Sequence, residues 1–130
     1  MTIFSKIIAG EIPCYKVAEN EMFIAFLDIF PVQLGHVLVI PKIEIDKIFD
    51  LPNEYLHEIL VFAKPIAKAI EQAFPCNRVN ILTVGLEVPH AHVHLIPIQE
   101  TNDMNLLNKK LQLTKEEFIE VQQKIMEHLS

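Results

Sequence analysis

The stretch that decides the fold of this chain is Val88-Pro89-His90-Ala91-His92-Val93-His94-Leu95-Ile96-Pro97. Its β-branched and apolar flanks favour an extended strand over residues 88–96. Successive side chains of a strand point to opposite faces, so the three imidazoles are expected to share one face. The other face carries Ala91, Val93 and Leu95, which are apolar enough to be buried. Such a row of titratable rings indicates a reaction centre.

Other interpretations of the histidine row have to be weighed. Its internal position and alternate spacing argue against a purification tag, and a solvated strand face more often carries Lys, Glu, Thr or Ser. A metal site is the serious rival, because imidazole is a ligand of zinc and copper. The outer two Cα atoms of an extended row lie about 13 Å apart, which disfavours one ion shared by all three rings. A site of two histidines completed by His36 or Asp28 stays open.

The composition indicates one domain with a substantial core. The chain has 130 residues, of which 51% are hydrophobic, and this fraction hints at surface buried against a partner. Its formal net charge is −6, from 11 basic and 17 acidic residues. That balance argues against partners such as nucleic acid or an anionic membrane. A small anionic ligand stays possible, since a few local donors hold one phosphate.

Two further features predict a cytoplasmic protein. No apolar run approaches the roughly 20 residues of a membrane-spanning helix, and the first residues lack the pattern of a secretory signal. The two cysteines, Cys14 and Cys76, lie far apart in the sequence and fit reduced thiols better than a disulfide framework.

Apolar periodicity and turn residues predict three helices and five strands. The helices are expected over residues 2–9, about 54–74 and about 114–129. Pro65 is expected to disturb the second helix. Thr114 and Glu117 have the spacing of a capping box at the start of the last one. The strands are expected over residues 14–17, 22–27, 36–40, 78–84 and 88–96. This order indicates an α+β domain with an antiparallel five-stranded sheet packed against helices.

Over about residues 1–98 the chain resembles the histidine-triad (HIT) family. The resemblance rests on four blocks in the family's order, IFSKIIAGEIP, AFLD, GHVLVIPK and EVPHAHVH, at residues 3–13, 25–28, 35–42 and 87–94. Four blocks together are far more specific than the histidine row alone, and they favour catalysis over metal binding. The fold that the family implies, an antiparallel sheet with helices, agrees with the predicted elements.

The resemblance implies hydrolysis or transfer at the α-phosphate of a nucleotide, without a cofactor. His92 would attack phosphorus and form a nucleotidyl-histidine, a role that suits a neutral imidazole, while a neighbouring main-chain carbonyl holds its other ring nitrogen. His90 and His94 would share the contacts to the phosphoryl oxygens and the proton transfer to the leaving group, with the phosphate contact given to His94. His36 matches the fourth histidine of the family and would support His90.

The resemblance also implies a nucleotide-binding set and a dimer. Asp28 would bind the ribose hydroxyls, although an aspartate at a strand end commonly caps a turn. The ligand would be an AMP- or GMP-containing nucleotide, because stacking on an aromatic face tolerates more than one base. Family members typically form homodimers, which would account for the high apolar fraction. The residues that would line the base pocket are Phe4, Ile7, Phe26, Ile29, Leu38, Thr83 and Val88. Without the resemblance, the apolar residues among them would be interpreted as core.

One departure from the family pattern concerns metal. Many bacterial relatives hold zinc with two cysteines near the start of the chain and a later histidine. Those positions are occupied here by Thr2, Ser5 and Glu44, so a structural zinc of that type is not expected.

The other departures concern the loop before the triad and the C-terminal segment. The loop looks shortened, Leu86 stands where a polar glutamine is usual, and Glu87 would repel phosphate unless it faces away. Ile98 replaces a common arginine, and residues 99–130 match no known pattern. Residues 1–98 are interpreted as the core of the domain and residues 99–130 as an extension of the same domain.

Three hypotheses follow. The favoured one is a metal-independent nucleotide hydrolase or transferase that works through His92. The second is a domain that binds nucleotides without turnover, which Leu86 and the short loop suggest. The third is a metal-binding protein that uses His90, His92 and His36.

Overall fold

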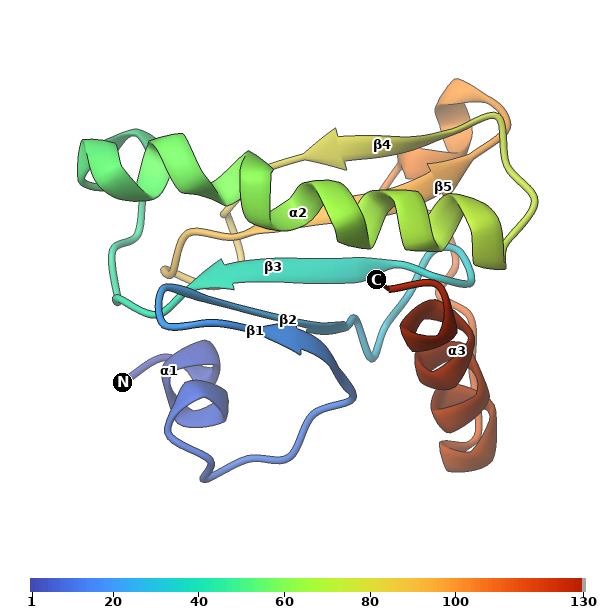
Figure 1. Ribbon diagram of the computed structural model, residues 1–130, viewed down its shortest axis with the longest axis horizontal. Helices are drawn as coiled ribbons and strands as arrows, with labels where there is room; N and C mark the ends of the chain where they lie inside the picture. The colour runs from blue at the N-terminus through green and yellow to red at the C-terminus, as the bar shows by residue number, and fades with distance from the viewer. Residues whose placement is uncertain (130) are drawn as a thin grey trace.

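The computed structural model describes residues 1–129 and contains one sheet with helices on both of its faces (Figure 1). The predicted α+β architecture is confirmed. Two 3₁₀ helices, Ile48–Asp50 and Thr101–Met104, join longer elements. Those longer elements are α1 (Ile3–Ile8), β1 (Lys16–Glu19), β2 (Phe23–Leu27), β3 (Val37–Pro41), α2 (Asn53–Ala73), β4 (Arg78–Leu82), β5 (Val93–Ile98) and α3 (Lys115–Glu127).

The five strands form a single antiparallel sheet in the order β1-β2-β3-β5-β4. Every residue of β2 and β3 is buried, because helices cover both faces of the sheet at its centre. Central strands covered on both faces are continuously apolar, as these two are, apart from Pro41 at the end of β3. β3 and β5 pair so that Leu38 lies opposite His94, which brings the block around His36 beside the triad.

The two faces of the sheet carry separate cores. On one face, alternate residues of β2, β3 and β5 pack with α2 and α3, and Val93 and Leu95 belong to this core as predicted. On the other face Ile24, Phe26, Leu38 and Ile40 pack with Phe4 of α1. The histidine side chains lie on this second face, where Phe4 contacts the rings of His90 and His92.

Helix α2 runs unbroken through Pro65, so the predicted disturbance does not interrupt it. Proline removes the hydrogen bond to the carbonyl four residues earlier, which belongs here to Val61. Val61 lies on the exposed side of the helix, with 63% of its surface accessible.

The C-terminal segment packs onto the sheet domain. Thr114 caps α3, and the predicted capping box with Glu117 is present. Phe118, Val121 and Ile125 of α3 are buried in the core that α2 covers. Before α3, the Leu111 amide donates to the Pro31 carbonyl, so the segment crosses the loop between β2 and β3. In the part of the chain that the structure describes, no helix is long and apolar enough to cross a membrane.

The bounds of all five strands differ from the prediction, those of β2 and β3 by only one residue. β1 covers Lys16–Glu19 rather than residues 14–17, and β4 ends at Leu82. The larger correction is that β5 begins only at Val93, so His90 and His92 precede the strand instead of lying on it. The physical reason lies upstream, where the His90 amide donates to the Val88 carbonyl at 2.8 Å and turns the chain.

Candidate active site

The first part of the triad, including His90 and His92, lies in a short loop that leads into β5, and His94 lies in the strand itself. The Ala91 amide donates to the Ile45 carbonyl at 2.7 Å, outside the sheet ladder. Thr83, just after β4, donates its hydroxyl to the His92 carbonyl at 2.8 Å. Although only His94 lies in the strand, the ring centroids of His92 and His94 are 5.1 Å apart, so the loop still places these two imidazoles side by side.

Both ring nitrogens of His90 have protein partners. Nε2 lies 2.9 Å from the Pro41 carbonyl, which only accepts, so Nε2 carries the proton. Nδ1 is then an acceptor in the neutral ring, and the Thr2 hydroxyl lies 3.0 Å from it. His90 is 0% exposed and therefore offers no free nitrogen to a ligand.

His92 is held in one tautomer by the main chain. Its Nδ1 lies 2.8 Å from the His90 carbonyl and must donate to it, as the prediction of a neighbouring carbonyl requires. In the neutral ring Nε2 is then unprotonated and bears a lone pair. An imidazole fixed in this way is ready to act as a nucleophile.

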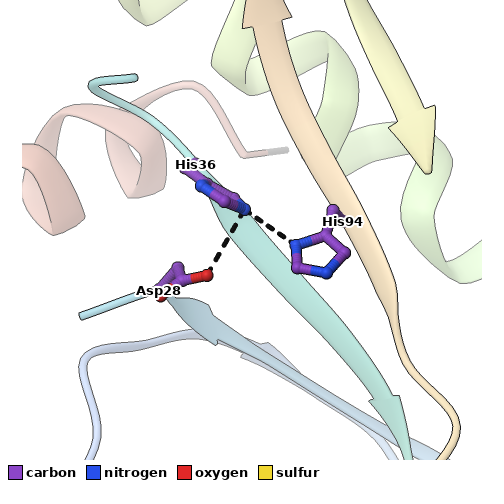
Figure 2. Close-up of side chains that lie close together, drawn as sticks. All are labelled: Asp28, His36 and His94. Atoms are coloured by element: carbon purple, nitrogen blue, oxygen red, sulfur yellow. Dashed lines mark hydrogen bonds and ion pairs between the residues drawn. The ribbon is translucent and has the colours of Figure 1, made fainter. Parts of the chain in front are cut away.

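A directed hydrogen-bond chain runs from the Val32 amide through His36 to His94, and Asp28 lies beside His36 (Figure 2). The Val32 amide donates to His36 Nδ1 at 3.2 Å, so His36 carries its proton on Nε2. That Nε2 lies 2.9 Å from His94 Nδ1 and 3.4 Å from Asp28 Oδ2. His94 Nδ1 is therefore an acceptor, and its Nε2–H remains available as a donor.

This chain corrects the prediction for His36, which supports His94 rather than His90. The physical reason is the register, because β3 pairs with β5 and only His94 of the triad lies in β5. Asp28 also accepts from the Phe30 amide at 2.8 Å, so it caps a turn while facing His36.

Burial keeps the imidazoles of His36 and His94 neutral near neutral pH. Desolvation, followed by the nearby Lys110 charge, lowers the pKa of His36 to about 3. Burial, followed by the charges of His36 and His92, lowers the pKa of His94 to about 4. Near neutral pH the His36 ring beside Asp28 is thus neutral, and the 3.4 Å contact between them is not an ion pair.

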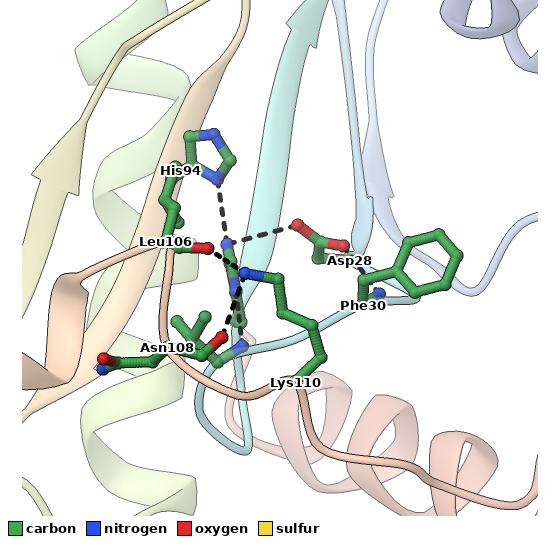
Figure 3. A network of polar contacts seen from close by, with 8 residues as sticks. Asp28, Phe30, His94, Leu106, Asn108 and Lys110 are labelled. Carbon is green, nitrogen blue, oxygen red and sulfur yellow. Dashed lines mark hydrogen bonds and ion pairs between the residues drawn. The ribbon is translucent and has the colours of Figure 1, made fainter. Parts of the chain in front are cut away.

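Lys110 of the C-terminal segment brings a cation to this site (Figure 3). Its ammonium group donates to the carbonyls of Leu106 and Asn108, which fixes the charge where it acts on His36 and His94. The sequence interpretation missed Lys110, because nothing in residues 99–130 indicates where that segment docks. In a chain of net charge −6 it supplies local positive charge for an anion.

Most of the predicted base-pocket residues lie together. Phe4, Phe26 and Leu38 belong to the smaller core, with Ile7 and Val88 packed against it. Ile29 is 53% exposed and lies outside that core, and Thr83 is exposed with its hydroxyl turned to the His92 carbonyl. The loop residues Leu86 and Glu87 are both exposed. Water therefore screens the Glu87 carboxylate and weakens its repulsion of a phosphate.

Three residues that could hold a metal ion converge within the described part of the chain. The ligand atoms of Asp28, His36 and His94 all lie within 4.8 Å of one another. These are not the three residues of the metal hypothesis, since His90 and His92 bond to the main chain instead. Of the residues in that hypothesis only His36 belongs to the group, which also contains Asp28, the other residue expected to complete a site of two histidines.

Comparisons with known proteins agree with this architecture. The model of the HIT domain family matches residues 9–101. The adenosine 5′-monophosphoramidase HNT1 of Saccharomyces cerevisiae is 43% identical over 100 residues, which are 73% of this chain and 61% of that protein, so the chain spans less than two thirds of that relative.

Solved structures share the fold over nearly the whole chain. A Hit-like protein from Bartonella henselae has a TM-score of 0.86 at 32% identity and covers 98% of this chain and 96% of its own. A Zn-bound histidine triad family protein from Mycobacterium smegmatis has a TM-score of 0.82 at 26% identity, with 98% of this chain and 91% of that chain covered.

Proposed function

The chain belongs to the HIT domain family, and on that premise we propose that it is a nucleotide hydrolase or transferase acting through a nucleotidyl-histidine. The substrate would be a nucleoside 5′-phosphate derivative, either a phosphoramidate or a dinucleoside polyphosphate with AMP or GMP as the nucleotidyl part. The observation that carries the proposal is the bond from His92 Nδ1 to the His90 carbonyl, which leaves Nε2 free for attack.

In the first step the lone pair of His92 Nε2 attacks the α-phosphorus and the bond from phosphorus to the leaving group breaks. The leaving group departs with the electron pair of that bond and takes up a proton from solvent water. The nucleotidylated ring is cationic, and its Nδ1–H stays bonded to the His90 carbonyl, which stabilises the charge. Water, or another acceptor in a transfer, then attacks phosphorus and releases the ring.

His94 suits the phosphate contact because its Nε2–H remains free while Nδ1 accepts from His36. That proton is fixed before the substrate binds, so the donor needs no reorganisation as charge builds on the phosphoryl oxygens. His90 takes a different role from the one predicted, because both of its nitrogens are bound within the protein. We assign it to positioning and not to proton transfer.

The nucleoside is proposed to lie along the smaller core, with Asp28 at the ribose. Asp28 is 17% exposed and keeps an oxygen within reach of solvent at the end of β2. The base would rest against the rim formed by Ile7 and Val88, with Phe4, Phe26 and Leu38 behind them. Ile29 and Thr83 lie at the edge, where their exposure leaves them available to a ligand.

The proposal is tested by intact-protein mass measurement after brief mixing with an adenosine 5′-phosphoramidate. We expect an added nucleotidyl mass in the unmodified protein and none in His92→Ala. His57→Ala is the matched control, since His57 is an exposed histidine of α2, and it should form the adduct normally. Turnover that persists in His92→Ala would refute the mechanism.

Leu86 favours one alternative, a domain that binds nucleotides without turning them over. It is 89% exposed in the loop before the triad, where it offers no hydrogen bond to a phosphate oxygen. Binding of AMP in calorimetry, combined with no adduct and no AMP release, would favour this alternative.

The group of Asp28, His36 and His94 is the observation behind a second alternative, a metal-binding protein. An ion there would have to replace the hydrogen bond between His36 and His94 and tolerate the cation of Lys110. Full activity of protein freed of metal by chelation would exclude a required ion.

We further propose a homodimer in the cytoplasm. β4 is an edge strand with Ile81 49% exposed, and α2 exposes Leu60 and Val61 to 56% and 63%. A second copy is a suitable cover for such apolar surface. Sedimentation analysis should give twice the chain mass, and a monomer at micromolar concentration would refute the dimer.

A further inference from the structure

Thr2, Ser5 and Glu44, the positions at which the family resemblance implies zinc ligands in bacterial relatives, form a hydrogen-bonded cluster with His90. The Thr2 and Ser5 hydroxyls lie 3.0 Å and 3.4 Å from His90 Nδ1. Structural zinc is bound mainly by thiolates and imidazoles, whereas this set offers two hydroxyls, one carboxylate and one imidazole that already has a partner. The cluster therefore does not fit such an ion.

The direction of these hydrogen bonds follows from which groups can only accept and which can only donate. The Ser5 hydroxyl, followed by the Thr2 amide, lowers the pKa of Glu44, so its carboxylate is ionised and only accepts. Ser5 Oγ, 2.6 Å from Glu44 Oε1, must donate to it, and the Thr2 amide donates to the same oxygen at 2.9 Å. Thr2 Oγ1 accepts from the Ser5 amide at 3.0 Å, and its own proton has two acceptors in reach, Ser5 Oγ at 3.3 Å and His90 Nδ1 at the shorter distance of 3.0 Å.

We propose that Thr2, Ser5 and Glu44 form a latch that positions the nucleophile His92 through His90, in place of a metal ion. The inference rests on the proposed function and names positioning residues for it. Thr2 and the Pro41 carbonyl hold the His90 ring from its two sides, at 3.0 Å and 2.9 Å. The His90 carbonyl accepts the hydrogen bond from His92 Nδ1–H, so a shift of His90 moves the acceptor that fixes the tautomer of His92.

Helix α1 makes a second contact with His90 and His92, through the ring of Phe4. Phe4 lies between Thr2 and Ser5 in the sequence, and its ring packs edge-on against His92 and His90 at centroid distances of 5.0 Å and 5.9 Å. With only 6 residues, α1 is too short to be stable alone. Its place against the triad therefore depends on tertiary bonds such as those from Thr2 and Ser5 to Glu44.

The kinetic test compares Thr2→Val with Thr2→Ser, using AMP release from adenosine 5′-phosphoramidate. Valine keeps the shape of threonine but loses the hydroxyl, and serine keeps the hydroxyl. We expect kcat to fall about tenfold in Thr2→Val, as for other partners that orient a reacting histidine, with KM changed less than twofold. Thr2→Ser should recover most of kcat. Glu44→Gln, on an exposed loop where folding is not at risk, should lower kcat in the same direction.

Thr114→Val is the matched control for the loss of a helix cap. Thr114 caps α3 through a bond from the Glu117 amide at 3.1 Å, as Thr2 caps α1, but it lies away from the triad. It should lower the melting temperature without lowering kcat. Equal kcat in Thr2→Val and the unmodified protein, or an equal loss in Thr114→Val, would overturn the latch.

An NMR measurement that needs no catalytic turnover tests the latch independently of the proposed function. Long-range proton–nitrogen NMR of the imidazoles reports which ring nitrogen carries hydrogen. We expect a slowly exchanging Nδ1–H on His92 in the unmodified protein and in Thr2→Ser, and faster exchange in Thr2→Val. Unchanged exchange would overturn the latch even if the protein is active. Changed exchange in a protein that forms no adduct would support the latch while refuting the catalytic proposal.

Discussion

At the scale of single residues, the site depends on which nitrogen of each imidazole is occupied. His90 and His92 bond to main-chain carbonyls, whereas His36 accepts from a main-chain amide. These three contacts orient the rings differently, so His92 presents a lone pair and His94 presents a proton. Four histidines of equal intrinsic chemistry thus receive different roles from their neighbours.

Gly35 places His36, and its replacement by alanine tests that placement. Its φ is +92°, and an added Cβ would lie 2.8 Å from the ring of Phe74. Both strain and overlap oppose a side chain, so Gly35→Ala should cost about 2 kcal/mol or more of unfolding free energy. Urea denaturation measures this cost. Gly10→Ala, which shares positive φ but meets nothing within 4 Å, is the control and should cost less. An equal cost at both positions would show that crowding by Phe74 is unimportant.

At the scale of elements, the short helix α1 and the C-terminal segment deliver residues to the site from opposite ends of the chain. α1 brings Thr2, Phe4 and Ser5 to His90. The C-terminal segment brings Lys110, and α3 buries three apolar residues on the far face of the sheet. We propose that residues 99–130 are part of the same domain, because α3 shares the core of α2.

Removing one buried side chain of α3 tests how much that helix stabilises the domain. Ile125 is 0% exposed, so Ile125→Ala should lower the unfolding free energy by about 2–4 kcal/mol. Met126, its neighbour at 48% exposure, is the control, and Met126→Ala should change it by less than about 0.5 kcal/mol. Denaturant titration of both variants gives the comparison. Similar small losses in the two would mean that α3 is not integral to the fold.

At the scale of the whole molecule, the buried histidines link folding to pH. The pKa of His36 falls from its ordinary 6.5 to about 3 on folding, and that of His94 falls to about 4. Above pH 6.5 both rings are neutral in either state and this contribution to stability is complete. Between pH 6.5 and 4 the unfolded chain binds protons that the folded protein does not, so stability is lost as the pH falls.

Each such histidine should steepen the loss by up to about 1.4 kcal/mol per pH unit within that window. His36→Gln should therefore show a shallower decline of unfolding free energy between pH 6.5 and 4.5 than the unmodified protein. Denaturant titrations at several pH values measure both slopes. His57→Gln, a change at an exposed position, should keep the original slope. Parallel slopes in His36→Gln and the unmodified protein would contradict a neutral buried His36.

Much of the architecture was predictable from the chain alone, and the reasons are local. The apolar runs of β2 and β3 and the capping box at Thr114 depend on residues close together in the chain, so a single sequence displays them. The boundary of β5 was not predictable in this way. Alternation of histidines is typical of a strand, but the bond from the His90 amide to the Val88 carbonyl and the pairing of Ala91 with Ile45 end the strand early.

The sequence by itself determined the family, the α+β class and the identity of the histidines that form the site. It did so because periodicity, caps and motif spacing are properties of consecutive residues. The tertiary structure alone shows that His36 bonds to His94, that Thr2 bonds to His90, and that the Lys110 charge acts on His36 and His94. These contacts join residues far apart in the chain, so strand register and the docking of terminal segments set them, and no local pattern records either.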